Sequence, residues 1–304
     1  MTSGRSALLA LLIFSLCASM SAQLITFSRE QMVTSTAENP YGRFEDGRPN
    51  VPDTLLEKLR GCSLEEVWNV LQQHGYTHQY ESKWQVAHPD QRLVGRAVTA
   101  QYLPVRPDVF QVIEGQNKGL QLPHTAGEGA LGHGTGYRRM VDVLQKGDVL
   151  VVDLFGSVDA GGPIGDNMAT AIYAATHAGL VIDGAVRDLD GILEIPMGTY
   201  FRAPHPAAVN NVMLSGINIP IRIGAVTVMP GDIVLGDREG VYFIPPALVQ
   251  EIVTTAEVTH IHDEWTKAKF MTGKYKASEL YPTPWDPQLK KEYEEYLKEK
   301  LGKK

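Results

Sequence analysis

The chain has 304 residues, of which 43% are apolar and 21% are charged, and its formal net charge is −7. This length and apolar content are sufficient for one large hydrophobic core. Nucleic acid and anionic lipid attract clustered Lys and Arg, so an acidic chain is a poor candidate for binding either of them.

The first 22 residues have the pattern of a secretory signal. Arg5 is their one charge, residues 7–16 form a short apolar run, and small residues at 21–22 offer a cleavage site. The apolar run is too short for a good transmembrane helix, although an uncleaved anchor is the alternative. We therefore predict an exported protein, periplasmic or secreted, with no stable membrane anchor and a formal net charge of −8 once Arg5 is removed.

The two cysteines give no disulfide framework, because Cys17 falls within the signal and only Cys62 remains. Cys62 stands between two predicted helices, and we expect it to be a small buried apolar residue rather than a nucleophile. Stability must then come from the core and from association of subunits.

Residues 23–52 are polar and contain turn signals, so we predict an arm that lies on the surface or on a neighbouring subunit. A short helix is predicted to begin at Asp53. Ser63 and Glu66 then form the capping-box pattern of a second helix that ends near Gly75.

Residues 93–103 are rich in β-branched side chains and alternate, which predicts a strand. The following segment, 104–146, gives few signals. It contains a glycine-rich run at 132–136 that superficially resembles a phosphate-binding loop, but no strong strand precedes it and Tyr-Arg-Arg follows it. We interpret this run as a loop near the functional site.

A strand is predicted over 149–154, and the glycine-rich loop 156–163 that follows would let a ligand approach the backbone closely. The stretch 165–188 then predicts a turn, a helix of about three turns, a stop at Gly179 and a buried strand. The stretch ends in Arg-Asp. Helix N-termini attract anions, Arg binds carboxylates with two prongs, and Asp offers hard oxygen ligands to a divalent metal.

Hairpin-like turns separate the later predicted strands, which favours an α/β fold with a mixed sheet. These strands are expected at 199–202, 222–228, 233–235 and 241–244. A long helix is predicted from Pro246 to about Thr272, and an amphipathic helix from 286 to 301 must cover either its own subunit or a partner.

Five segments, in order, carry a resemblance to a known family. They are Leu93–Thr99, Gly147–Asp153, Val181–Asp188, Pro230–Asp232 and Asp237–Val241. With them the chain resembles the RraA-like proteins, which include the class II 4-hydroxy-4-methyl-2-oxoglutarate/4-carboxy-4-hydroxy-2-oxoadipate aldolases. The family's hallmark is an acidic residue or glycine, twenty intervening residues and then Arg-Asp, and Asp166 followed by Arg187-Asp188 has that spacing.

The resemblance implies an α/β/β/α sandwich with a mixed sheet, assembled as a homotrimer or hexamer with sites at subunit boundaries. Residues 53–245 would form this domain, between the arm and a helical extension over 246–304. Asp188 would coordinate Mg²⁺ or Mn²⁺, and Arg187 would bind the pyruvyl carboxylate or keto oxygen. Backbone amides would hold the carboxylate at Gly165, Asp166, Asn167 and Met168.

The resemblance also implies a second catalytic acid from a neighbour's C-terminal helix, for which Glu264, beside Asp263, is the match. A solvated helix charge is the alternative for Glu264, and a loop ion pair that caps the next helix is the alternative for Arg187-Asp188. The implied function is a divalent-metal-dependent lyase on a small 2-keto acid. The alternative is a non-catalytic binding or regulatory protein of the cell envelope. Segment 104–146 is longer than the family's usual connection, which places the substrate in doubt.

Overall fold

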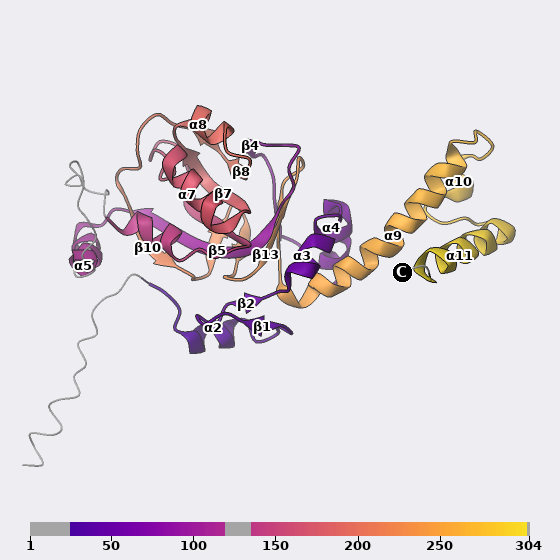
Figure 1. Ribbon diagram of the computed structural model, residues 1–304, viewed down its shortest axis with the longest axis horizontal. Coiled ribbons are helices and arrows are strands. Elements are labelled where there is room, and N and C mark those ends of the chain that lie inside the picture. Colours follow the sequence, from indigo (N-terminus) through magenta and orange to yellow (C-terminus); the bar gives the residue numbers. More distant parts are fainter. Residues whose placement is uncertain (1–24, 119–134, 303–304) are drawn as a thin grey trace, which may run out of the picture.

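A curled mixed sheet forms the body of the molecule (Figure 1). The computed structural model describes residues 25–118 and 135–302, and within them the sheet has ten strands. Its main order is β3-β14-β13-β5-β6-β7-β8-β4, with β10 paired to β5 and β9 paired to β7. The strands are β3 (Tyr80–Glu81), β4 (Gln85–Val86), β5 (Leu93–Pro104), β6 (Asp148–Ser157), β7 (Gly179–Val186), β8 (Gly198–Phe201), β9 (Ala203–Pro204), β10 (Val212–Ile217), β13 (Ile233–Gly236) and β14 (Val241–Ile244).

Strands β5 to β8 run parallel to one another, while β13, β14 and β10 join antiparallel. Three helices on one face contribute to a common apolar cluster: α6 (Arg139–Asp142), α7 (Asp166–Thr176) and α8 (Leu189–Leu193). The predicted α/β fold with a mixed sheet is therefore confirmed.

Successive side chains of β6 point to opposite faces of the sheet, and both faces are apolar. Leu150 and Val152 pack into the cluster beneath the helices, and Val149 and Val151 pack into a second cluster on the opposite face. That second cluster includes the hairpin β11 (Ile221–Ile223) and β12 (Val226–Val228). Both faces of the parallel strands are buried, so apolar residues are needed at every position.

A third apolar cluster lies between helices and the antiparallel part of the sheet. The helices are α3 (Asp53–Leu59), α4 (Leu64–Gln73) and the first half of α9 (Val249–Phe270). The predicted capping box at the start of α4 is present, with both Ser63 and Glu66 in place. Cys62 is a free, buried residue of this cluster, and burial raises the pKa of its thiol to about 11. The predicted burial of this cysteine is confirmed.

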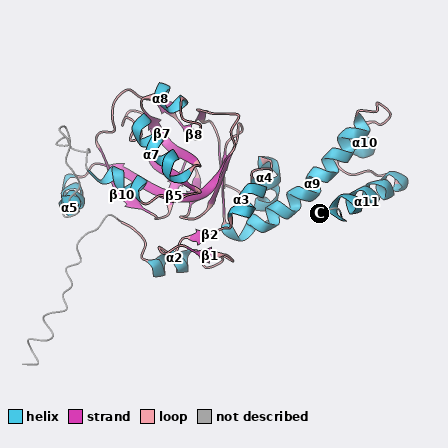
Figure 2. Cartoon of the chain, viewed as in Figure 1, coloured by secondary structure: helices cyan, strands magenta, loops and turns pink. Residues whose placement is uncertain are grey.

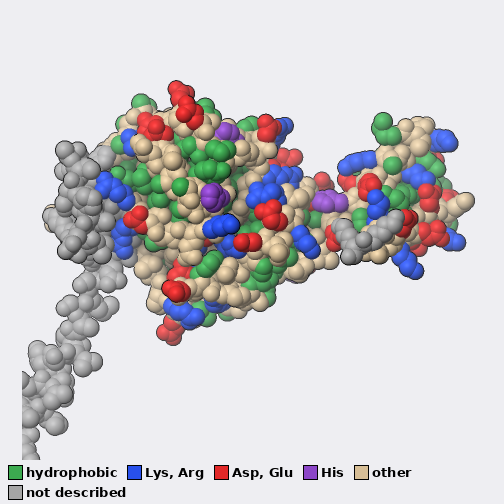
Figure 3. Space-filling view, in the orientation of Figure 1, with side chains coloured by type: hydrophobic (Ala, Val, Ile, Leu, Met, Phe, Trp, Pro, Cys, Tyr) green, Lys and Arg blue, Asp and Glu red, His purple; other side chains and the backbone are tan. Residues whose placement is uncertain are grey.

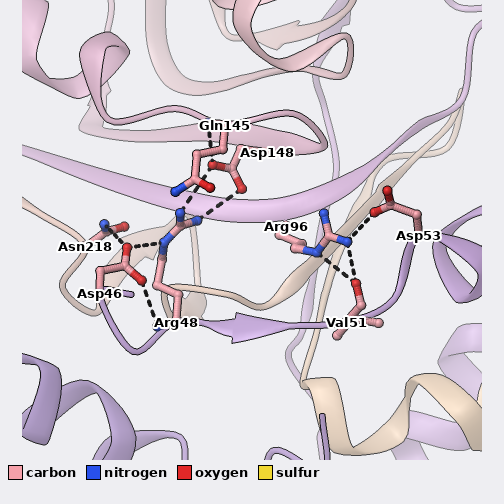
Figure 4. Close-up of polar contacts among 8 residues, drawn as sticks. All are labelled: Asp46, Arg48, Val51, Asp53, Arg96, Gln145, Asp148 and Asn218. Atoms are coloured by element: carbon pink, nitrogen blue, oxygen red, sulfur yellow. Dashed lines mark hydrogen bonds and ion pairs between the residues drawn. The ribbon is translucent and has the colours of Figure 1, made fainter. Parts of the chain in front are cut away.

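The N-terminal arm is more ordered than its polar sequence predicts. It contains α2 (Arg29–Ser35), which begins with a capping box of Ser28 and Gln31, and a hairpin of β1 (Gly42–Arg43) with β2 (Pro49–Asn50). Two buried arginines fasten the arm to the body (Figure 4). Arg48 of the arm pairs with Asp148 at the start of β6, and Arg96 of β5 donates to the carbonyl of Val51. The arm therefore lies on its own chain.

The C-terminal helices extend away from the sheet body (Figures 1 and 2). The short η3 (Pro246–Leu248) leads into α9, and α10 (Ala277–Leu280) precedes α11 (Pro287–Gly302). The ring of Tyr293 on α11 lies 5.5 Å from that of Trp265 and 5.2 Å from that of His262, both on α9. The amphipathic face of α11 is therefore partly covered by its own chain, and none of its residues is fully buried.

Three details differ from the predictions. Strand β10 was not expected, and the single strand expected over 222–228 is a hairpin that turns at Gly224, where φ is +55°. Helix α7 ends with His177 in the left-handed conformation, whereas Gly179 is the first residue of β7. Gly179 is needed there because a Cβ would collide with Leu93 and with the Gly198 carbonyl.

Segment 104–146 contains α5 (Pro107–Lys118) and η2 (Thr135–Arg138) on either side of the undescribed residues. The predicted signal, and most of the glycine-rich run at 132–136, lie outside the described residues. In the described part of the chain, no helix is both long enough and apolar enough to cross a membrane. Acidic and basic side chains are interspersed over the face shown in Figure 3, on the body and on the C-terminal helices alike.

Candidate active site

The start of α7 and the end of β7 meet at the carboxyl edge of the parallel strands. This edge is where open α/β sheets bind ligands. The Arg187 backbone N–H, directly after β7, donates to the Ile164 carbonyl at 3.0 Å, directly before the N-cap of α7. Residues twenty-odd positions apart are thereby placed side by side, as the hallmark spacing predicts.

Gly165, the N-cap of α7, lies against the side chains of both site residues. Its φ of −112° is open to any residue, so space rather than backbone conformation calls for glycine here. An added Cβ would collide with Oδ2 of Asp188 and would lie 3.1 Å from Nε of Arg187. The structure thus brings Gly165, Arg187 and Asp188 into one cradle.

Arg187 and Asp188 retain hydrogen-bonding capacity. The distance from Arg187 Nη1 to Asp188 Oδ2 is 3.7 Å, which is long for a charge-assisted hydrogen bond. Nε of Arg187 is buried and has no hydrogen-bond partner among the described residues. Asp188 is the N-cap of α8 but makes no side-chain capping bond. The alternative was a loop ion pair that caps the next helix. The ion pair is present, but the side-chain cap is not.

Asp188 also has a constrained backbone, with φ of 53° and ψ of 46° in the left-handed region. This conformation is uncommon for a residue with a side chain, although Asp and Asn tolerate it better than most residues. Such strain is found most often at binding and catalytic sites. It fixes the direction in which the carboxylate leaves the chain.

The helix start is partly occupied by the chain itself. Oδ1 of Asp166 accepts a hydrogen bond from the Asn167 N–H at 2.7 Å, so an incoming carboxylate would compete with Asp166 for that amide. A Cβ on Gly191 would lie 2.6 Å from the Cβ of Asp166, so α8 packs closely against this turn. Met168, in the same first turn, packs against the cluster beneath the helices.

The glycine-rich loop 156–163 has a structural role that sequence reasoning missed. A Cβ on Gly161 would lie 2.5 Å from the Ala208 carbonyl, and one on Gly162 would lie 2.6 Å from the Arg187 nitrogen. Gly161 thus lets the backbone at 207–208 pack against the loop, and Gly162 lets the backbone at 186–187 do so, instead of admitting a ligand. Gly156 has open space around its Cα, so ligand approach is possible there. The run of glycines in the sequence indicates that something approaches this loop closely. It does not indicate whether a ligand or another segment of the chain does so.

Glu264 is not brought to this cradle within one chain. Helix α9 packs on α3, α4 and α11 and runs away from the part of the body that carries α7 (Figure 1). Oε1 of Glu264 lies 2.7 Å from Nζ of Lys300 on α11, and hydrogen bonds from Lys300 and Tyr296 lower the pKa of the Glu264 carboxyl. Asp263 pairs with Lys267 at 2.8 Å. A role for Glu264 in a neighbouring subunit stays a prediction.

The cradle suits a hard divalent cation held by one protein carboxylate. Among the described residues, no group of three or more His, Cys, Asp or Glu side chains is arranged to hold a metal. Mg²⁺ keeps several of its waters and is often bound through one or two carboxylates. The Asp188 side chain is 44% exposed, so its carboxylate is accessible from solvent.

Fold and site together define a mixed α/β protein with an Arg-Asp site at the carboxyl edge of its parallel strands. The chain belongs to the RraA-like family, since the family model described as Aldolase/RraA matches residues 50–243.

Relatives within the family carry aldolase names. The chain is 33% identical over 111 residues to a provisionally named 4-hydroxy-4-methyl-2-oxoglutarate aldolase of Ectopseudomonas mendocina, covering 36% of this chain and 68% of that protein. A Halalkalibacterium halodurans protein with the same name is 31% identical over 118 residues, and the match spans 39% of this chain and only 56% of that relative.

The fold is shared with Streptomyces coelicolor RraAS2, described as an unusual member of the RNase ES inhibitor RraA protein family. The TM-score is 0.59 at 23% identity, over 76% of this chain and 100% of that chain. The predicted family and fold are confirmed, and the aldolase names support a lyase.

Proposed function

We propose that the protein is a divalent-metal-dependent carbon–carbon lyase acting on a small 2-keto acid. Its reaction would be the retro-aldol cleavage of a 4-hydroxy-2-oxo diacid, the decarboxylation of an oxaloacetate-like compound, or both. The observation that carries the proposal is the cradle, where buried Nε of Arg187 lacks a partner beside Asp188 and the absence of a side chain at Gly165 lets both residues lie against the start of α7. The names of the relatives support the same reaction class.

Both reactions break a carbon–carbon bond next to a 2-keto acid and leave the enolate of pyruvate. The guanidinium of Arg187 would bind the substrate carboxylate or keto oxygen and stabilise negative charge as it develops there. Asp188 would be the direct protein ligand of Mg²⁺ or Mn²⁺, which when bound supplies a Lewis acid at the keto oxygen. The start of α7 adds partial positive charge to the carboxylate end of the site.

The remaining expectations belong to the same proposal. The active form would be a homotrimer or hexamer, with Glu264 of a neighbouring subunit as the candidate second acid. The protein would act outside the cytoplasm, with small-molecule keto acids as its ligands.

A coupled pyruvate-release assay tests the proposal. The purified protein would be given oxaloacetate and hydroxylated keto diacids, with Mg²⁺, with Mn²⁺, and after treatment with EDTA. We expect pyruvate release that requires the metal and returns when the metal is restored. Absence of release from every compound, in folded protein supplied with metal, would overturn the proposal.

The second candidate is a non-catalytic binding protein of the cell envelope. One observation favours it: the site residues partly satisfy one another, through the 3.7 Å contact of Arg187 with Asp188 and the Asn167 amide bound by Asp166. A protein of this kind would show ligand-induced thermal shifts with the keto diacids but no turnover.

A further inference from the structure

A separate cavity lies between the N-terminal arm and the sheet body. Its volume is about 450 Å³, and its walls come from residues 34–39 of the arm, from Tyr76 and Gln79, and from the turn and helix start around Asp232 and Pro245. We call it the arm cavity. None of its lining residues belongs to the cradle, so it is independent of the proposed active site.

Asp232 places a buried carboxyl group at this cavity. The residue is 4% exposed. Its backbone carbonyl accepts a hydrogen bond from Ala97 N–H, and its backbone N–H donates to the Met229 carbonyl. Its side chain accepts one hydrogen bond among the described residues, from Met229 N–H to Oδ2 at 2.8 Å. A carboxylate has about four acceptor sites, so most of its capacity is unused.

Burial of Asp232 favours its neutral form and raises the pKa of its carboxyl to about 7, against the opposing effect of Met229 N–H. At neutral pH this group therefore exchanges between its protonated and its ionised form. A cation that reached it would replace the hydration that burial has removed.

The other charged group at the cavity has the same sign. Glu38 lines the arm side of the cavity and is exposed. Burial raises the pKa of the nearby Tyr76, and the negative charges of Glu38 and Asp232 raise it further. The lining residues include no Lys, Arg or His. The guanidinium of Arg43 lies near the cavity, where it donates hydrogen bonds to Thr36 and to the Gly47 carbonyl. These bonds direct it to the arm itself. The cavity therefore favours a positively charged ligand.

The walls indicate an organic cation rather than a metal ion. A hydrated metal ion would leave apolar walls in contact with its water, whereas the carbon chain of an organic cation would cover them. Several walls are apolar, from Ala37, Met229, Pro245, Pro246 and Ala247. We propose that the arm cavity binds the ammonium group of a compact organic amine, with Asp232 and Glu38 accepting its hydrogen bonds and the apolar walls covering its carbon chain.

Calorimetric titration of the full chain at pH 8 tests this proposal. The probes are n-butylamine and 1,4-diaminobutane, which are protonated at this pH, and 1-butanol as a neutral molecule of similar size. We expect saturable binding of the amines and none of 1-butanol. Asp232→Asn and Glu38→Gln should each weaken binding by about tenfold or more.

Two controls keep the result interpretable. Glu30→Gln removes an acid of the arm, on α2, that does not line the cavity, and this variant should bind the amines as the wild type does. At pH 6 the amine should displace a proton from Asp232, so the measured heat should depend on the buffer's ionisation enthalpy in wild type but not in Asp232→Asn. Equal binding of 1-butanol, no saturable amine binding, or unchanged binding in both acid variants would each overturn the proposal.

Discussion

Arg48 and Asp148, a hundred positions apart in the chain, form an ion pair in which neither side chain is exposed. Nη1 of Arg48 lies 3.1 Å from Oδ1 of Asp148, and Nη2 lies 3.3 Å from Oδ2 (Figure 4). The Phe44 ring covers the guanidinium, with its centroid 5.0 Å from Cζ of Arg48. The pair joins the arm to the first residue of a central parallel strand. Arm and sheet therefore depend on each other for stability.

Removing one partner of this pair should be strongly destabilising, because it leaves a buried charge without compensation. We expect Arg48→Met to lower the free energy of unfolding by about 3–5 kcal/mol, measured by urea denaturation. Replacing both residues, as Arg48→Met with Asp148→Leu, should recover much of that loss. Arg106→Gln, which breaks the exposed pair of Arg106 with Asp108, should leave the midpoint unchanged. Equal midpoints for Arg48→Met and Arg106→Gln would contradict the prediction.

Arg187→Ala and Asp188→Ala should each lower the turnover of metal-dependent pyruvate release by about 10² to 10³, as loss of an electrostatic group in the transition state does. Unfolding midpoints should stay near that of the wild type, because both side chains are partly exposed. Arg238→Ala is the matched control, since it removes an exposed arginine that pairs with Asp90. Near-normal turnover in either site variant would remove these residues from the catalytic site.

Gly165→Ala tests the cradle without changing any charge. The added methyl group would press on the carboxylate of Asp188 and on Nε of Arg187, so we expect a fall in turnover and a higher metal requirement. The backbone at this position accepts Ala, so the thermal midpoint should change little. Gly42→Ala, where a Cβ meets open space, should alter neither quantity. If the two variants behave alike, the close packing at Gly165 has no functional consequence.

Asp232 should make stability depend on pH in a defined direction. Burial raises the pKa of its carboxyl to about 7, against about 4 in an unfolded chain, so between these values the folded protein holds a proton that the unfolded chain has lost. Its contribution to stability is complete below pH 4 and declines as the pH rises through 7. Asp232→Asn should match the wild type near pH 4 and exceed it at pH 8 by up to about 4 kcal/mol. A constant difference across this range would refute the assigned pKa.

Glu264 can be tested for a role in a neighbouring subunit by mixing variants. If Glu264 is the second acid, Glu264→Gln should lower turnover by about 10² or more. If its exposed pair with Lys300 of its own chain is its whole role, turnover should stay within about twofold. If the variant is inactive, mixed subunits of Glu264→Gln and Arg187→Ala should regain activity by forming complete sites between chains. That recovery would establish the acid as a residue of the neighbour's site.

Local signals in the sequence predicted the elements that depend on near neighbours. The capping box of Ser63 and Glu66 and the apolar run of β6 are patterns of adjacent residues. The Arg-Asp spacing was identified through the family resemblance. The arm was predicted as a loop, because the partner of Arg48 lies far along the sequence and no local pattern indicates it.

The same limit applies to the site. The Arg187-Asp188 pair was predicted, but its contact with Gly165 and the packing of Gly162 behind it arise only when α7 and β7 meet. Strand β10 was missed for a related reason, since its pairing partner β5 is more than a hundred residues away.

Helix α9 has 22 residues, so it is about 33 Å long, and only its first half packs on the body. Its second half projects beyond the body and packs on α11, where the ring of Trp265 lies 5.5 Å from that of Tyr293. The contacts of α3 and α4 with the first half of α9 therefore also set where α11 lies relative to the sheet.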